Sequence, residues 1–350
     1  MGKRIVIMAG GTGGHVFPAL AVAQLLMDKG WQVSWLGTQK GLEGRVVPEN
    51  GIDIDWLTVA GVRGKGMSSK VSAVFMLLRA CGQAARILRQ RKPDVVLGMG
   101  GFVAGPGGLM AKLLGIPLVI HEQNRVPGTT NRLLAKIANQ VLEAFPNSFP
   151  KKVGAQCTGN PLRKAFLEPA AKERPKNPTV NLLIFGGSQG AKILNEVAPD
   201  AVAQVTDIQV IHQTGAAMLE QVKARYRDLN IKAHATAFIE DMVAAYQWAD
   251  IVVCRSGAMT VSEIAAMGVP AIFIPLPNAI DDHQVANARY LTDAGAGLLL
   301  LQKDLTPMTL AEKITTTLGQ LDMMHSAAQQ CARMDATDAV AAICMAEAKP

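Results

Sequence analysis

The sequence has few aromatic residues and no regular cysteine spacing. Phe, Trp and Tyr make up 5% of its 350 residues, and only three of them are Tyr. The five cysteines are odd in number, scattered, and without C-x-x-C spacing. This pattern indicates reduced thiols rather than a disulfide framework. The scarcity of tyrosine and the lack of an RNA-reading motif argue against a nucleic-acid partner.

The chain also lacks a long hydrophobic run free of glycine and proline. The apolar run after Met1 is too short for a secretory signal and predicts a strand. Residues 95–120 contain one charge, Lys112, and are long enough to span a bilayer. Seven glycines and two prolines interrupt that segment. We therefore expect strand, turn, helix and strand there, and no transmembrane segment.

Positive charge is concentrated in the first half of the chain. Residues 1–160 contain 19 basic and 8 acidic side chains, a net +11, whereas residues 161–350 contain 16 and 20, a net −4. Eight Lys or Arg and no acid lie between Asp55 and Asp94. Such a surface is typical of proteins that meet anionic lipid or a phosphorylated ligand. The length predicts about two domains.

One pattern of strand, glycine turn and helix occurs twice. Its two copies are Arg4–Met8, Gly10–Gly14 and a helix near Phe17–Lys29, and Val180–Phe185, Gly186–Gly190 and a helix from about Ala191. Alternation of strands with helices predicts parallel sheets covered on both faces. The fold class is therefore α/β, with two Rossmann-like domains whose parallel sheets face a central cleft. Ligands in such sheets bind at the carboxyl ends of the strands.

The first glycine loop, Gly10–Gly14, favours contact with a phosphate or a sugar, because backbone N–H groups and the helix dipole attract negative charge there. A tight strand-to-helix turn is the alternative. The dinucleotide pattern G-x-G-x-x-G fails, since Val16 occupies its last glycine position. His15 follows the loop, where a neutral imidazole can accept a proton. A structural cap or a packed side chain is the alternative for His15.

The second half contains the candidate nucleotide site. Ser188 adds a hydroxyl to the second glycine loop, and Glu263 lies in the first turns of a later helix. A glutamate there can accept both ribose hydroxyls, or only place negative charge near a helix N-terminus. Asp281–Gln284 has no further His or Cys at metal-ligand spacing. Asp53-Ile54-Asp55 has the D-x-D spacing of metal-dependent sugar transferases, but alternation along a polar strand is favoured there, so we expect no metal. A departing diphosphate then needs helix N-termini and a basic side chain such as Arg163.

Residues 70–92 predict a basic helix with one apolar stripe formed by Val71, Val74, Phe75 and Leu78. In one interpretation the stripe packs on its own sheet. In the other it enters a bilayer, with Lys70, Arg79 and Arg86 near anionic headgroups.

Six strings together resemble one family. They are GGTGGHVFPAL at 10–20, GVRGKG at 61–66, GMGGFV at 98–103, HEQN at 121–124, GGSQGA at 186–191 and CRSGAMTVSE at 254–263. In this order the chain resembles the MurG family, the N-acetylglucosaminyltransferases of bacterial peptidoglycan synthesis. The resemblance implies a GT-B fold. Its domains are expected over 1–162 (acceptor- and membrane-facing) and 163–334 (UDP-GlcNAc-binding), with a helix in 335–350 that returns to the first domain.

The resemblance implies transfer of N-acetylglucosamine from UDP-GlcNAc to the 4-hydroxyl of the MurNAc sugar of lipid I, the undecaprenyl-diphosphate-linked MurNAc-pentapeptide. The product is lipid II, formed with inversion and without a cofactor. It further implies a peripheral protein on the cytoplasmic face of the inner membrane. An anionic membrane surface and other cell-wall synthesis or division proteins are the further partners expected.

The resemblance also implies residue roles. Ile239 binds the uracil through its backbone, Glu263 binds the ribose, and Ser188 binds the diphosphate. His15 is the candidate general base, with Glu122 as its rival or helper. The other substrate-binding residues that it implies are Thr12, Gly13, Gly14, Asn124, Arg163, Ala258, Met259, Thr260, Val261, Ser262 and Gln284.

Two alternative functions stay open from the residues alone. A UDP-GlcNAc 2-epimerase of the same fold would turn over the nucleotide sugar without any acceptor. A non-catalytic nucleotide-sugar-binding protein would bind the donor without turnover.

Overall fold

The computed structural model describes residues 2–59, 67–168, 179–187, 190–277 and 282–349, with side chains from residue 74 onward in the helix that begins at 67. The motif at 61–66, Ser188 and Asp281 lie outside these residues. The chain divides into two compact units. Unit 1 comprises Met1–Arg163 and Met334–Pro350, and unit 2 comprises Lys164–Arg333.

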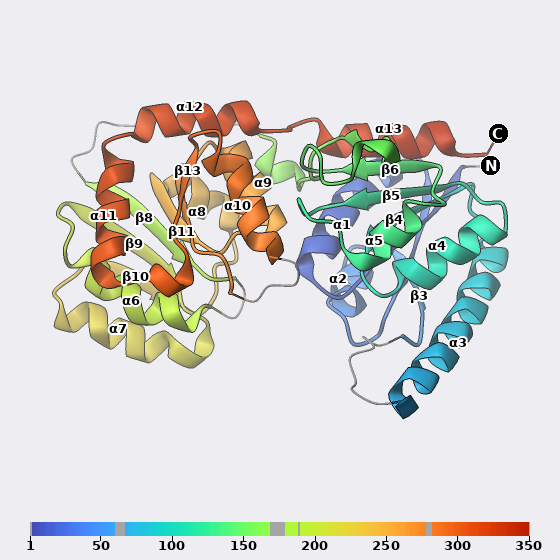
Figure 1. Ribbon diagram of the computed structural model, residues 1–350, viewed down its shortest axis with the longest axis horizontal. Helices are drawn as coiled ribbons and strands as arrows, with labels where there is room; N and C mark the ends of the chain where they lie inside the picture. The colour runs from blue at the N-terminus through green and yellow to red at the C-terminus, as the bar shows by residue number, and fades with distance from the viewer. Residues whose placement is uncertain (1, 60–66, 169–178, 188–189, 278–281, 350) are drawn as a thin grey trace. The chain divides into compact units, whose positions relative to one another are not determined.

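Unit 1 is built on a parallel sheet with the strand order β3-β2-β1-β4-β5-β6-β7 (Figure 1). The strands are β1 (Arg4–Ala9), β2 (Gln32–Gly37), β3 (Asp53–Trp56), β4 (Val95–Gly100), β5 (Leu118–Glu122), β6 (Gln140–Glu143) and β7 (Gln156–Cys157). The order reverses direction between β1 and β4, which is where sheets of this class bind ligands.

Helices cover both faces of this sheet, because the strand side chains that point to either face are apolar. Ile5, Ile7 and Ala9 of β1 belong to the core under α1 and α13, whereas Val6 and Met8 belong to the core under α3 and α4. The helices are α1 (Gly13–Asp28), α2 (Glu43–Glu49), α3 (Met67–Arg91), α4 (Ala104–Leu113), α5 (Thr129–Leu134) and α13 (Ala336–Glu347), with a short 3-10 turn η1 (Lys151–Val153). Although α13 follows unit 2 in the chain, it packs on α1, β4 and β5 (Figure 1).

Unit 2 repeats the plan with the parallel order β10-β9-β8-β11-β12-β13. Its strands are β8 (Val180–Phe185), β9 (Ile208–Gln213), β10 (Ala233–Thr236), β11 (Ile251–Cys254), β12 (Ala271–Phe273) and β13 (Gly297–Leu299). The switch point here lies between β8 and β11. Both sheets therefore confirm the predicted pair of Rossmann-like domains.

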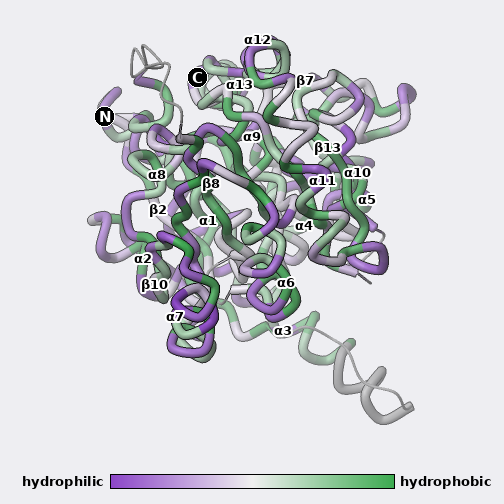
Figure 2. The backbone as a smooth tube through the Cα atoms, turned by 90° about the vertical axis from the view of Figure 1, so that its left-hand side faces the viewer, coloured by the Kyte–Doolittle hydropathy of each residue, from purple (hydrophilic) through white to green (hydrophobic). Residues whose placement is uncertain are grey.

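Unit 2 also has helices on both faces of its sheet. α6, α7 and α11 share one apolar core with the strands, while α9 packs with α8, α10 and α12. Figure 2 shows α7 mostly in the hydrophilic colour, as expected for a helix with one buried stripe. The helical segments are η2 (Lys164–Phe166), α6 (Lys192–Val202), η3 (Ala216–Met218), α7 (Leu219–Asp228), α8 (Met242–Trp248), α9 (Ala258–Met267), α10 (His283–Thr292), η5 (Gln302–Asp304), α11 (Pro307–Leu318) and α12 (Leu321–Cys331).

Two helices differ from their predicted form. α1 begins at Gly13, four residues before the predicted Phe17, because the glycine loop itself provides the first turn. In α3, the interpretation in which the apolar stripe packs on the sheet is wrong for the described side chains: Phe75 is 72% and Leu78 65% exposed. The buried face is formed instead by residues farther along α3, including Ala84 and Leu88.

The D-x-D pair is tied into an ion pair. Asp53 Oδ2 and Asp55 Oδ2 lie 3.0 and 2.7 Å from Arg91 nitrogens at the end of α3. These two carboxylates therefore connect β3 to α3. Among the described residues, no helix is long and apolar enough to cross a membrane.

Two buried histidines predict acid sensitivity of the fold. Burial lowers the pKa of His121 to about 4 and that of His212 to about 3, from an ordinary 6.5. As the pH falls, these histidines are protonated in the unfolded chain at a higher pH than in the folded protein. Their contribution to the free energy of unfolding is therefore complete above pH 6.5 and decreases as the pH drops toward 4. The loss is about 3 kcal/mol for His121.

Thermal unfolding between pH 7.5 and 4.5 measures this effect. His121→Gln should unfold at a lower temperature at pH 7.5 but lose less on acidification than the native chain. An equal acid dependence in both proteins would contradict the assignment.

Candidate functional site

In each unit the loops that follow the strands gather functional groups at the carboxyl edge of the sheet. In unit 1 the loop after β1 and the end of β4 flank the switch point. In unit 2 the loops after β8 and β11 do so. Backbone N–H groups at helix N-termini lack partners within the helix and are suited to anionic or hydroxyl ligands.

His15 lies in the first turn of α1, against the end of β4. Its Nδ1 is 3.3 Å from the Thr12 hydroxyl, and its ring is so close to Gly100 that a Cβ there would lie 2.8 Å from ring carbon Cδ2. Gly100 also has a φ of +106°, which favours glycine. Burial lowers the pKa of His15, opposed by the negative charge of Glu122, a hydrogen bond with the Gly10 backbone and the charge of Glu43. The ring is thus held neutral.

Glu122, at the end of β5, is bound by its own loop. Its Oε1 accepts hydrogen bonds from the backbone N–H and the side-chain amide of Asn124, at 2.9 and 3.2 Å. Its Oε2 accepts from the Gly128 N–H at 3.1 Å and from the Asn131 amide at 2.9 Å. With 2% of its surface exposed, this carboxylate holds the loop after β5 in place and has little freedom to take a proton from a ligand.

The other predicted residues near α1 are Thr12, Gly13, Gly14 and Arg163. Thr12 precedes the first turn of α1, which begins with Gly13 and Gly14. The Arg163 side chain is exposed, and its guanidinium carbon lies 5.6 Å from the centre of the Phe17 ring. This distance fits a cation–π contact that places Arg163 over the first turns of α1.

Unit 2 contains a cavity of about 740 Å³ at the carboxyl edge of its sheet. The predicted residues Thr260 and Gln284 line it together with the glycine loop after β8. Lys192, Arg255 and Gln302, which the sequence did not single out, line it as well. The Gln284 side chain accepts a hydrogen bond from the Leu276 N–H at 2.9 Å and so fixes one wall.

The first turn of α9 opens from Gly257. The N–H groups of Ala258, Met259 and Thr260 precede the first intrahelical hydrogen bond, which Val261 donates to Gly257. The Val261 side chain is fully buried, and the Ser262 hydroxyl donates to the Ala258 carbonyl of its own helix at 3.1 Å. The segment therefore offers a ligand its backbone N–H groups together with the partly exposed side chains of Met259 and Thr260.

Glu263 lies one turn farther along α9. Its Oε2 accepts a hydrogen bond at 3.2 Å from the hydroxyl of Tyr246, a fully buried residue of α8. The Tyr246 ring is fixed by edge contacts with Phe166 and Phe185, each with ring centres 6.0 Å apart. The orientation of Glu263 thus depends on an aromatic cluster beneath it.

Gln213 and Arg255 are two positioning residues that the sequence interpretation missed. Gln213, at the end of β9, donates to the Gly187 carbonyl and accepts from the Ile239 N–H, both at 2.8 Å. It therefore connects the glycine loop to the segment predicted to meet uracil, and in this structure it occupies the Ile239 N–H. Arg255 donates to the carbonyls of Ile274 and Pro275 at 2.9 Å. The available signal was their place at strand ends: Gln213 is the last residue of β9, and Arg255 directly follows β11.

No group of three His, Cys, Asp or Glu side chains suited to a metal ion occurs among the described residues. The groups available at both carboxyl edges are backbone amides, hydroxyls, side-chain amides and a few cations. Such groups can bind an anionic ligand and stabilise a leaving diphosphate.

Family models place the chain among the glycosyltransferases. The glycosyltransferase family 28 N-terminal domain matches residues 5–143, and the family 28 C-terminal domain matches residues 181–343. The chain belongs to glycosyltransferase family 28.

Relatives that match over the full length of the chain are more specific than the family models. The chain is 56% identical to a UDP-N-acetylglucosamine–N-acetylmuramyl-(pentapeptide) pyrophosphoryl-undecaprenol N-acetylglucosamine transferase of Methylococcus capsulatus, over 99% of both chains. It is 51% identical to the transferase of the same name from Shewanella denitrificans, over 98% of this chain and 97% of that one. The crystal structure of Acinetobacter baumannii MurG matches with a TM-score of 0.85 and 44% identity, over 98% and 99% of the two chains. The fold is thus GT-B.

Gly100→Ala tests the contact that positions His15. The new methyl group would overlap the imidazole, and a non-glycine residue at this φ is strained by about 1–3 kcal/mol. We expect a displaced His15 ring signal in the NMR spectrum and a lower unfolding temperature.

Gly105→Ala is the matched control, because a Cβ there makes only an ordinary 3.6 Å contact with Thr130 and α4 favours alanine over glycine. An unchanged His15 signal in Gly100→Ala would show that the contact does not position the ring.

Proposed function

We propose that this chain is the inverting glycosyltransferase that moves N-acetylglucosamine from UDP-GlcNAc to the 4-hydroxyl of the MurNAc sugar of lipid I, giving lipid II. The observation that carries this proposal is the 56% identity, over the whole chain, to a relative whose name states that transfer. The glycine loops at the ends of β1 and β8 support it, since each lies at the switch point of its sheet.

In this proposal unit 2 binds the donor. The first turn of α9 offers the diphosphate and sugar the N–H groups of Ala258, Met259 and Thr260, which precede the first hydrogen bond within the helix. Ser188 adds a hydroxyl. Glu263 accepts the ribose hydroxyls, and the Tyr246 hydroxyl keeps its carboxylate in place. Uracil binds the backbone of Ile239. Because the Ile239 N–H donates to the Gln213 side chain, either that hydrogen bond breaks when uracil binds, or uracil binds only the Ile239 carbonyl.

Asn124 and Gln284 are the proposed contacts to the sugar hydroxyls. Each already has a hydrogen bond that fixes its place, to Glu122 and to the Leu276 N–H. Thr12, Gly13 and Gly14 are the further donor contacts proposed from unit 1, through their backbone, and Arg163 is proposed to support the leaving diphosphate by its charge.

His15 acts as the general base in this proposal, in preference to Glu122. The imidazole is neutral and partly exposed, whereas both Glu122 oxygens already accept two N–H donors each. As the acceptor oxygen forms its bond to the anomeric carbon, the bond to UDP breaks on the opposite side, which inverts the configuration. His15 takes the hydroxyl proton, and the helix N-termini of unit 2 stabilise the charge on the departing UDP.

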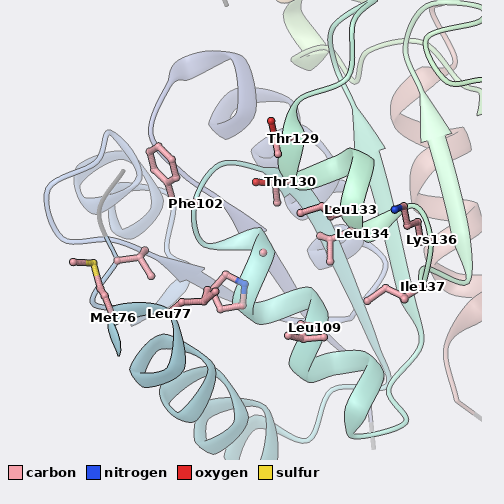
Figure 3. A pocket seen from close by; sticks show the side chains of 13 residues that line it. Met76, Leu77, Phe102, Leu109, Thr129, Thr130, Leu133, Leu134, Lys136 and Ile137 are labelled. Atoms are coloured by element: carbon pink, nitrogen blue, oxygen red, sulfur yellow. The ribbon is translucent and has the colours of Figure 1, made fainter. Parts of the chain in front are cut away.

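The membrane-facing surface in this proposal is the apolar side of unit 1. A cavity of about 490 Å³ is lined by residues of α3, α4 and α5. Figure 3 shows the lining side chains, among them Phe102, Leu109 and Leu133. Val74, Phe75, Leu77 and Leu78 of α3 are exposed. Lys136 lines the cavity, where its charge suits anionic headgroups. We infer peripheral attachment at the cytoplasmic face of the inner membrane, in the neighbourhood of other cell-wall synthesis and division proteins.

Incubation of the chain with UDP-GlcNAc and a lipid I analogue tests the proposed reaction. UDP release that depends on the acceptor, and a product with a β linkage, are the expected results. No release above the acceptor-free control in several detergents would reject the transferase. Conversion of UDP-GlcNAc without acceptor would instead indicate an epimerase.

Replacement of His15 by alanine tests its role as the base. We expect kcat to fall at least about tenfold, because a positioned base contributes about 10²–10⁴-fold in rate. Donor affinity, measured by calorimetry with UDP-GlcNAc, should stay within about twofold, since unit 2 binds the donor.

His234→Ala, which removes an exposed imidazole from β10 of unit 2, is the matched control and should keep the native rate. Native turnover by His15→Ala would transfer the role of base to another group.

The double variant Phe75→Asp with Leu78→Asp tests the membrane surface. Both side chains are exposed on α3, so the fold should persist while binding to anionic liposomes weakens about tenfold or more. Turnover of a water-soluble acceptor should be unchanged.

Met308→Asp with Met323→Asp places the same charges at two exposed apolar positions of unit 2 and is the control. Equal liposome binding by the α3 variant and the native protein would exclude this surface.

A further inference from the structure

A buried carboxylate joins two loops at the carboxyl edge of unit 1. Glu43, the first residue of α2, has no exposed surface. Its Oε2 accepts a hydrogen bond from the Gly11 N–H at 3.0 Å. Its Oε1 accepts from the Thr38 N–H at 3.0 Å and the Thr38 hydroxyl at 2.7 Å. One side chain therefore ties the loop after β1 to the loop after β2.

Three glycines make room for this carboxylate. A Cβ at Gly10 would lie 2.6 Å from Glu43 Oε1, one at Gly37 would lie 2.8 Å from its Cγ, and one at Gly41 would overlap its Oε2. Gly10 belongs to the loop after β1, and the other two flank the loop after β2. The fit between the side chain and its surroundings thus depends on Gly10 of the first glycine motif and on two glycines next to the loop after β2.

The three hydrogen-bond donors to Glu43 are uncharged. Removal of a carboxylate from water is costly, and here two backbone N–H groups and one hydroxyl offset that cost through charge-assisted hydrogen bonds. In ligand-binding loops of the strand–glycine–helix type, N–H groups such as that of Gly11 face the anionic ligand. Glu43 places a negative charge of the protein itself at that position.

We propose that Glu43 is a positioning residue, whose carboxylate replaces an external anion in the glycine loop of unit 1 and so fixes the loop that carries His15. Thr12 directly follows Gly11, and its carbonyl accepts a hydrogen bond from the His15 N–H at 3.1 Å, so a loop held at Gly11 sets where the first turn of α1 begins. The charge of Glu43 also acts on the imidazole, whose pKa it raises against the effect of burial. The inference rests on the proposed function, because its catalytic consequence assumes that His15 is the base.

Glu43→Gln tests the proposal, since glutamine keeps the shape and one acceptor but removes the charge and the second acceptor. We expect kcat to fall at least tenfold, with the KM for UDP-GlcNAc within about threefold of native. The acid limb of the kcat profile should move to lower pH, because the imidazole loses a nearby negative charge. Amide hydrogen exchange at Gly11 and Thr38 should become faster.

Glu49→Gln is the matched control, because it removes the same charge from an exposed position of the same helix. It should leave kcat, the acid limb and amide exchange unchanged. If Glu43→Gln does not fold, Thr38→Val, which removes only the hydroxyl donor, should show the same changes at smaller size. Native kcat and an unmoved acid limb in a folded Glu43 variant would overturn the proposal, even if its unfolding temperature were lower.

Exchange at Gly11 and the NMR titration of His15 need no substrate, so they separate the two proposals. If the native chain shows no transfer, the proposed function fails. Faster exchange and a lowered His15 pKa in Glu43→Gln would still support the positioning role. If the native chain catalyses transfer but Glu43→Gln has the native exchange rate at Gly11 and the native pKa of His15, only the proposal for Glu43 fails.

Discussion

The parallel pairing of buried strands is the constraint on which the rest of the structure depends. Every paired strand in both sheets runs in the same direction, so every strand delivers its following loop to one edge of its sheet. Parallel sheets occur with helices over both faces. In β1 the neighbouring residues Ile5 and Val6 are accordingly both buried, in cores on opposite faces of the sheet. Loops distant in the chain therefore meet, and the glycine loops after β1 and β8 each meet a second strand end at a switch point.

The two units use this shared edge differently. Unit 1 satisfies its loops with carboxylates of its own: Glu43 binds the loop after β1, and Glu122 binds the loop after β5. In unit 2 the first turn of α9 and the glycine loop after β8 line a cavity, and Arg255 holds the wall at Ile274 by a hydrogen bond to its carbonyl. The first arrangement is suited to holding His15 in one orientation. The second is suited to receiving a ligand that brings its own negative charge.

Much of this could be predicted from the sequence, because strands buried on both faces and glycine turns are local signals. The two sheets, the two glycine loops and the place of His15 followed from them. For the stripe of α3 the sequence left two interpretations open, because periodicity shows an apolar face but not what lies against it; the exposure of Phe75 and Leu78 contradicts packing on the sheet. Glu43 and Gln213 were missed because their partners, 32 and 26 residues away, are brought near only by the tertiary fold. Glu122 became a weaker candidate for the base once its four hydrogen bonds were known.

The central claim is that a neutral His15, held by the loop of unit 1, accepts the proton in the transfer. Burial lowers the pKa of His15 below its ordinary 6.5, so the ring should stay neutral to lower pH than a free histidine. The most direct measurement compares the NMR titration of His15 in the free enzyme with the acid limb of kcat/KM. The account predicts that both midpoints coincide and lie below pH 6.5. An acid limb that occurs at a different pH from the His15 titration would contradict it.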